Sequence, residues 1–105
     1  MIDALKNLFS SSPAPDYKEL LTNGAVIVDV RTRGEFAGGS IKGSVNIPLD
    51  QLSNNLGRFK SKETPIITCC ASGMRSASAK NLLKSQGFTN VHNGGGWHSL
   101  SSKLK

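Results

Sequence analysis

The most regular hydrophobic pattern along the chain is a series of short β-branched runs, each followed by a longer stretch with helical spacing. Residues 26–30 form the first run and residues 66–69 form another. Neither run alternates regularly with polar residues, which favours strands covered on both faces, as in a parallel sheet. The run at 45–47 predicts a further short strand that Pro48 stops.

Helices are expected between these runs. Segment 75–86 carries apolar residues on one side and lysines on the other, and it stops at Gly87. Segment 16–21 has acidic residues in its first turn and stops at Gly24. Segment 49–56 has a weaker helical pattern. Strands separated by helices imply right-handed crossovers and an α/β layer architecture.

Shorter signals complete this expected order of elements. Thr32 and Glu35 are spaced as a capping box, which predicts a short helix that ends by Gly38. The remaining expected elements are a last strand at 88–92, a turn at 94–96 and a closing helix at 97–104.

The length of 105 residues is enough for a single domain with one hydrophobic core. We expect the domain to span residues 14–105, preceded by a short amphipathic helix and linker at 1–13. Ile2, Leu5 and Phe9 have helical spacing, which favours packing on the domain over membrane attachment. Charged residues interrupt this segment, so it lacks the apolar region of a signal peptide.

The charge pattern does not indicate binding to nucleic acid or to a membrane. Thirteen Lys and Arg residues against seven Asp and Glu give a net charge of +6, which attracts small anions. The basic residues are scattered without interleaved aromatic residues, so neither nucleic acid nor membrane is an expected partner. His92 and His98 have no companion ligands at metal spacing, and we expect no metal and no cofactor.

The two cysteines, Cys69 and Cys70, are adjacent. Consecutive Cα atoms lie about 3.8 Å apart, which is too close for an unstrained disulfide. Two free thiols suggest a reducing compartment, and we expect a cytoplasmic protein. Alternation along the strand sends Cys69 into the core, although a resolving thiol that exchanges with Cys70 is the alternative.

The candidate chemistry lies in the loop between the strand at 66–69 and the helix at 75–86, because ligands in α/β folds bind beyond the carboxyl ends of strands. Cys70 is the candidate nucleophile. If the loop curls around its sulfur, backbone N–H groups and the helix N-terminus stabilise the thiolate and lower the pKa of the thiol. The candidate anion-binding residues are Ala71, Ser72, Gly73, Met74, Arg75 and Ser76.

Four motifs follow one another along the chain: Asp29-Val30-Arg31 with Glu35-Phe36, the segment from Gly39 to Pro48, the loop from Cys70 to Ser76, and Gly95-Gly96-Trp97. In this order, over roughly residues 14–100, they resemble the rhodanese family. The resemblance implies a three-layer domain with a central five-stranded parallel sheet and helices on both faces. It also implies a thiosulfate-type sulfurtransferase in which Cys70 accepts sulfur as a persulfide and passes it to cyanide or a thiol, such as a protein thiol.

Two other functions stay open at this point. Related phosphatases and arsenate reductases separate the cysteine and arginine by five residues, whereas four separate Cys70 and Arg75, and the tighter ring suits sulfur. Rhodanese-like domains also serve as non-catalytic interaction modules, often after loss of the cysteine. Asp29 and Arg31 are expected to support the site, and Asp29 is a candidate carboxylate partner for Arg75. We expect Arg31 and Glu35 to organise the first loop.

Overall fold

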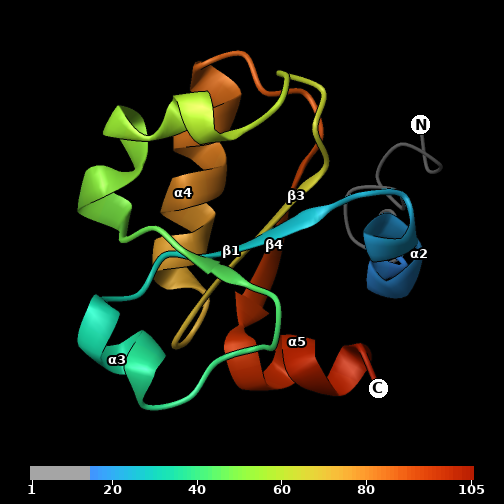
Figure 1. Cartoon of the computed structure of the whole chain (residues 1–105), viewed down its shortest axis with the longest axis vertical. Helices are drawn as coiled ribbons and strands as arrows, with labels where there is room; N and C mark the ends of the chain where they lie inside the picture. The colour runs from blue at the N-terminus through green and yellow to red at the C-terminus, as the bar shows by residue number, and fades with distance from the viewer. Residues whose placement is uncertain (1–14) are drawn as a thin grey trace, which may run out of the picture.

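The computed structural model describes residues 15–105, which form a single parallel sheet with helices packed on it (Figure 1). The strands are β1 (Val26–Asp29), β2 (Val45–Asn46), β3 (Ile66–Cys70) and β4 (Val91–Gly96), in the spatial order β2-β1-β3-β4. The helices are α2 (Tyr17–Thr22), α3 (Arg33–Ala37), α4 (Met74–Ser85) and α5 (Trp97–Lys103), with 3-10 turns η1 (Leu49–Asn54) and η2 (Leu56–Arg58). The expected α/β architecture is confirmed.

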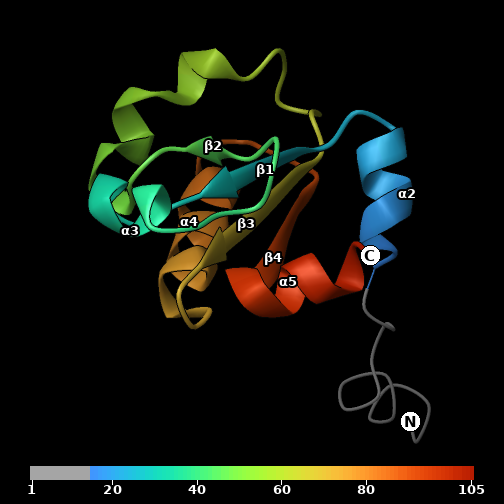
Figure 2. The same ribbon diagram turned by 60° about the horizontal axis from the view of Figure 1, so that its bottom comes forward.

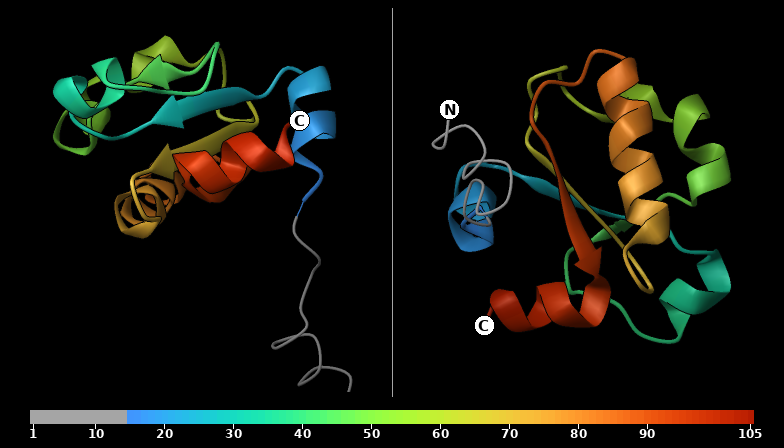
Figure 3. Two further views of the ribbon diagram at one scale, coloured as in Figure 1. Left: turned by 90° about the horizontal axis from the view of Figure 1, so that it is seen from below. Right: turned by 180° about the vertical axis from the view of Figure 1, so that it is seen from behind.

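Helices cover both faces of the sheet, which makes three layers (Figure 2). Seen from behind in the right panel of Figure 3, α4 lies over one face. On the other face α2 and α5 lie together, and Lys103 Nζ stands 5.7 Å from the ring of Tyr17. Side chains of β3 alternate between the two cores, with Cys70 on the α4 side and Cys69 on the α5 side. Within residues 15–105, no helix is long and apolar enough to cross a membrane.

The sheet has four strands, and the expectation of five is wrong for the described residues. The β-branched runs at 26–29 and 66–68 form β1 and β3 at the centre of this sheet. The helix and linker expected at 1–13, together with the domain start at 14, fall outside the described residues and stay predictions.

The last strand begins later than the sequence predicts. Residues 91–96 form β4, so the turn expected at 94–96 is wrong. Thr68 pairs with Asn93 and Cys70 with Gly96, which leaves one extra residue on β4 between these pairs. Gly95 takes a positive φ of 80° in this bulge. The glycine run therefore predicts a turn from the sequence, but in the structure it forms the bulged end of a strand.

Gly94 is packed so tightly that a side chain cannot be added. A Cβ atom there would lie 2.8 Å from Thr68 O, 2.9 Å from Ile67 Cγ2 and 2.9 Å from Leu100 Cδ2. This close packing holds β4 and α5 against β3, next to the loop that follows β3. The other departure is at 49–56, where Asn54, Asn55 and Gly57 favour two 3-10 turns over one α-helix.

We predict that Gly94→Ala lowers the free energy of unfolding by about 2 kcal/mol or more, because the methyl group overpacks a rigid contact. Urea unfolding of the purified variant measures this loss. Gly57→Ala is the control, since nothing lies within 4 Å of its added Cβ. Equal losses in the two variants would contradict the packing role of Gly94.

Candidate active site

The loop after β3 is short and bends sharply into α4. Cys70 is the last residue of β3, and α4 begins at Met74. Gly73 joins them with φ of 102°, a left-handed conformation that disfavours a side chain. This conformation turns the first amides of α4 back toward the cysteine. The expected junction of strand, glycine turn and helix is present.

The sulfur of Cys70 lies inside a cradle of donors. Gly73 N lies 2.9 Å and Ser76 N lies 3.3 Å from Cys70 Sγ, and both donate hydrogen bonds to the sulfur. Ser76 Oγ lies 3.4 Å from the same atom. Burial raises the pKa of Cys70, but hydrogen bonds from the Ser76 hydroxyl and from N–H groups of Ser76, Gly73 and Ser72 outweigh burial. The pKa of Cys70 therefore lies below its ordinary value, the direction that the sequence predicts.

Ser76 is held in place by contacts on both sides. Its hydroxyl donates to Asn93 Oδ1 at 2.6 Å, and Thr68 Oγ1 donates to Ser76 O at 2.9 Å. Asn93 Oδ1 also accepts from Gly95 N at 2.9 Å, which ties it to the bulge of β4. The sequence analysis missed Asn93, because only the β3–β4 register places it beside the loop.

Arg75 is paired with a carboxylate that the sequence did not identify as its partner. Its Nη1 and Nη2 atoms donate to Glu35 Oε1 and Oε2 at 2.7 and 2.9 Å. Both side chains are about one-third exposed. Arg75 and then the Thr32 N–H lower the pKa of Glu35 to about 2. The capping box of Thr32 and Glu35 is confirmed, and the same glutamate also ties α3 to the active-site loop.

Asp29 pairs with Arg31, so the expected Asp29–Arg75 pair is wrong. Arg31 Nε and Nη2 donate to the Asp29 carboxylate at 2.7 to 3.0 Å, and both residues are buried. Arg31 also donates to Glu35 O and Gly39 O, and its guanidinium lies 4.7 Å from the Trp97 ring. Arg31 thus organises the loop after β1, as the sequence predicts. Because Arg31 lies close to Asp29 in the chain, it occupies this buried carboxylate, which is then not available to Arg75.

The remaining loop positions are open to solvent. Ala71, Ser72 and Met74 are exposed, and Met74 shows 79% of its surface. Cys69 is fully buried on the opposite face of β3, which confirms packing in the core. Burial and the nearby Asp29 charge raise the pKa of Cys69 to about 12. Only Cys70 is therefore placed to act as a thiolate.

This arrangement provides a nucleophilic sulfur and a cradle for its negative charge at the carboxyl ends of the strands. Among residues 15–105, His, Cys, Asp and Glu side chains form no group suited to hold a metal ion. A model of the rhodanese-like domain matches residues 13–103 of the chain. The chain belongs to the rhodanese-like domain family. The loop from Cys70 to Ser76 lies within the residues that match this family.

Relatives of this rhodanese-like chain include enzymes of sulfur transfer. It is 31% identical over 93 residues to the human thiosulfate:glutathione sulfurtransferase, covering 75% of this chain and 81% of that protein. A structure of a human single-domain sulfurtransferase superposes with a TM-score of 0.75 at 28% identity, covering 90% of this chain and 99% of that one. Sulfurtransferases are thus among its relatives in both sequence and fold.

Other relatives of the rhodanese-like chain are longer than it is. An uncharacterised protein of Bacillus subtilis is 35% identical over 82 residues, which cover 77% of this chain and 64% of that protein. The match to an Escherichia coli protein covers 48% of that protein. The chain therefore spans about half to two thirds of the length of these curated relatives.

We predict that Ser76→Ala slows alkylation of Cys70 by iodoacetamide about three- to tenfold at pH 7, because the contact between the Ser76 side chain and the sulfur, which lowers the pKa of Cys70, is lost. The measurement is the alkylation rate as a function of pH, whose midpoint should move upward. Ser78→Ala is the matched control, since Ser78 is exposed on the same helix. An unchanged midpoint in Ser76→Ala would show that the hydroxyl does not stabilise the thiolate.

Proposed function

We propose that this protein is a sulfurtransferase in which Cys70 carries sulfur as a persulfide. The observation that carries the proposal is the convergence of the Gly73 and Ser76 N–H groups on one buried sulfur, with the Ser76 hydroxyl oxygen 3.4 Å from it. Donors fixed in this way stabilise a thiolate before a substrate arrives. N–H groups of the same loop would also stabilise the anionic outer sulfur of a persulfide.

The proposed reaction has two displacement steps. Cys70 thiolate attacks the outer sulfur of thiosulfate, a new S–S bond forms, and sulfite leaves with the electron pair of the broken bond. An acceptor thiolate then attacks the outer persulfide sulfur, and Cys70 leaves as a thiolate. Cyanide is the acceptor in a laboratory assay, and a small or protein thiol is the acceptor in the cell. No external oxidant or reductant is needed in either step.

The relatives support this choice of donor and acceptor classes. The human relative is named for thiosulfate and for glutathione, which is a thiol. A pocket of about 400 Å³ lies at the same edge of the sheet as Cys70, because its lining residues follow β1, β2 and β3. The lining consists of Val30, Thr32, Pro48, Leu49, Asp50 and Arg75. We propose that an acceptor thiol approaches Cys70 from this side.

The competing functions have less support. Four residues separate Cys70 and Arg75, and the amides of Gly73 and Ser76 lie 2.9 and 3.3 Å from the sulfur itself, so a tight loop that favours sulfur over the larger phosphate group is the simpler interpretation. A purely non-catalytic module would not require a cysteine with a lowered pKa at this position. A thiolate carrier functions in a reducing compartment, and we propose the cytoplasm.

Cys70→Ser is expected to abolish thiosulfate-dependent thiocyanate formation from cyanide, because a serine hydroxyl in the same cradle stays protonated and cannot store sulfur. Cys69→Ser is the matched control and should keep most of the activity, since Cys69 faces the opposite core. A colorimetric thiocyanate assay of the purified variants measures both. Full activity in Cys70→Ser, or Cys70-dependent release of phosphate from p-nitrophenyl phosphate, would refute the proposal.

Glu35→Gln is expected to lower the KM for thiosulfate about three- to tenfold at low salt, because Arg75 becomes free to attract a doubly charged donor. Glutamine retains the side-chain oxygen that accepts from the Thr32 N–H, so the start of α3 is kept. Steady-state kinetics at two ionic strengths measure the change. A raised KM would show instead that the ion pair is needed to hold the loop in its binding conformation.

A further inference from the structure

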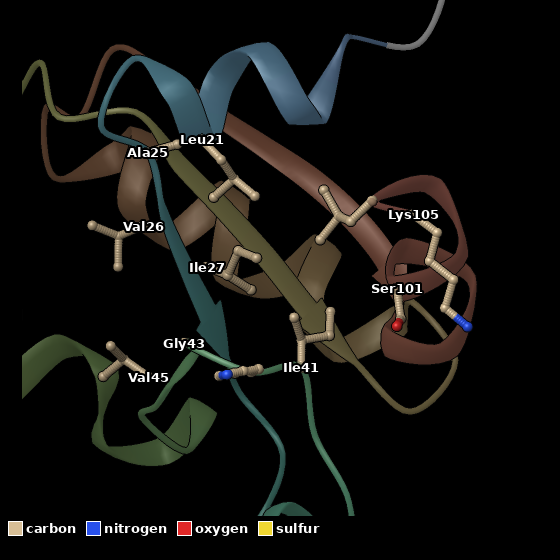
Figure 4. Close-up of a pocket in the computed structure, with 11 residues that line it drawn as sticks. Leu21, Ala25, Val26, Ile27, Ile41, Gly43, Val45, Ser101 and Lys105 are labelled. Carbon is tan, nitrogen blue, oxygen red and sulfur yellow. The ribbon is translucent and has the colours of Figure 1, made fainter.

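An apolar groove of about 620 Å³ lies away from Cys70, between α2, β1, the segment before β2 and the end of α5 (Figure 4). Five half-buried apolar residues line it: Leu21, Ala25, Val26, Val45 and Leu104. In the described chain, Met74 is the one large hydrophobic residue that is exposed, so half-buried apolar side chains are gathered here and not scattered as exposed ones. A cluster of this kind normally marks a surface that another segment or molecule covers.

The groove exists because β2 is too short to cover β1. Of the β1 residues, only Val28 and Asp29 pair with β2, so Val26 and Ile27 have no neighbouring strand on that edge within residues 15–105. The chain reaches β2 through Lys42 and Gly43, where Gly43 takes a φ of 85°. This turn directs the chain away from the first half of β1. The hollow is therefore a consequence of local geometry at the edge of the sheet.

We propose that residues 1–9 of this chain occupy the groove as an amphipathic helix. Ile2, Leu5 and Phe9 recur at helical spacing and supply the apolar stripe that the groove needs. A nine-residue helix is about 13 Å long. An isolated helix of this length is not stable in water, so it requires a partner surface in order to form.

The connecting chain is long enough to reach the groove. The six residues at 10–15 span up to about 20 Å when extended, whereas the six residues of α2 rise only about 9 Å. The chain can therefore run back along α2 to Leu21, which lies in the last turn of α2 and lines the groove. A short tether also holds the segment near the groove at an effective concentration in the millimolar range, which favours it over a second copy.

The charges of the segment also favour docking on the protein over a membrane. Helices that lie on anionic membranes are rich in Lys and Arg on the polar face. Residues 1–9 carry one acid and one base, Asp3 and Lys6, and have no net side-chain charge. The groove has Lys42 and Lys105 among its lining residues, which can pair with Asp3.

The test compares two single substitutions in the full chain, Leu5→Asp and Asn7→Asp. Both add one negative charge, but Leu5 lies on the apolar stripe and Asn7 lies off it. The readouts are the thermal unfolding midpoint and amide hydrogen exchange at residues 25–27 and 101–104. Leu5→Asp should lower the midpoint by about 4 °C or more and speed exchange at both sites, whereas Asn7→Asp should do neither.

A double-mutant cycle with Leu104→Asp locates the contact. Leu104→Asp lowers the midpoint by itself, and adding Leu5→Asp should lower it no further if both residues belong to one contact. Alkylation of Cys70 should stay unchanged in Leu5→Asp, which keeps this test independent of sulfur transfer.

Three results would overturn the proposal. The first is an equal midpoint and equal exchange in Leu5→Asp and the unmodified chain. The second is a dimer in analytical ultracentrifugation that Leu5→Asp dissociates, which would assign the stripe to a second copy. The third is cosedimentation with phosphatidylglycerol vesicles that Leu5→Asp abolishes without any change in exchange at residues 25–27.

Discussion

The structure of the site depends on one contact, the hydrogen bond from the Gly73 N–H to the sulfur of Cys70. It requires a left-handed residue at the start of α4, and glycine meets that requirement at low cost. Once the chain turns there, the first turn of α4 brings the N–H and hydroxyl of Ser76 to the same sulfur. Strand, turn and helix thus combine into a thiolate cradle that needs no separate general base.

Two neighbouring networks surround this cradle. The buried Asp29–Arg31 pair fixes the loop after β1, and the Arg75–Glu35 pair connects that loop to α4. Asn93 braces Ser76 from the side of β4. These networks join the ends of β1, β3 and β4, so the site depends on the sheet register as much as on its own loop. A reactive sulfur is therefore kept in a rigid part of the fold.

Most of the architecture is predictable from local signals in the sequence. The β-branched runs, the capping box at Thr32 and the glycine after α4 set the elements to within a few residues. The bulged end of β4 was missed because Gly94 is required by the contact with Thr68, which is remote in sequence. The resemblance implied a fifth strand, whereas the sheet of the described residues has four.

The pairing of residues within the site was harder to predict than the identity of the site residues. Cys70 and Ser76 can be predicted from the loop motif, because both lie within the same short segment of the chain. The pairing of Arg75 with Glu35 joins residues 40 positions apart, and several carboxylates compete for that arginine. The sequence offered Asp29 as a candidate, but the nearby Arg31 occupies it with a short, buried pair. Such choices are settled by three-dimensional packing and not by spacing along the chain.

The central claim is that the Cys70 thiolate stores a sulfur atom. The most direct measurement is mass spectrometry of the intact protein and its peptides after brief mixing with one equivalent of thiosulfate, with released sulfite quantified in parallel. We expect a mass gain of one sulfur atom on the Cys70 peptide, matched by one equivalent of sulfite. An unchanged mass, or a sulfur atom on Cys69 with Cys70 unmodified, would contradict it.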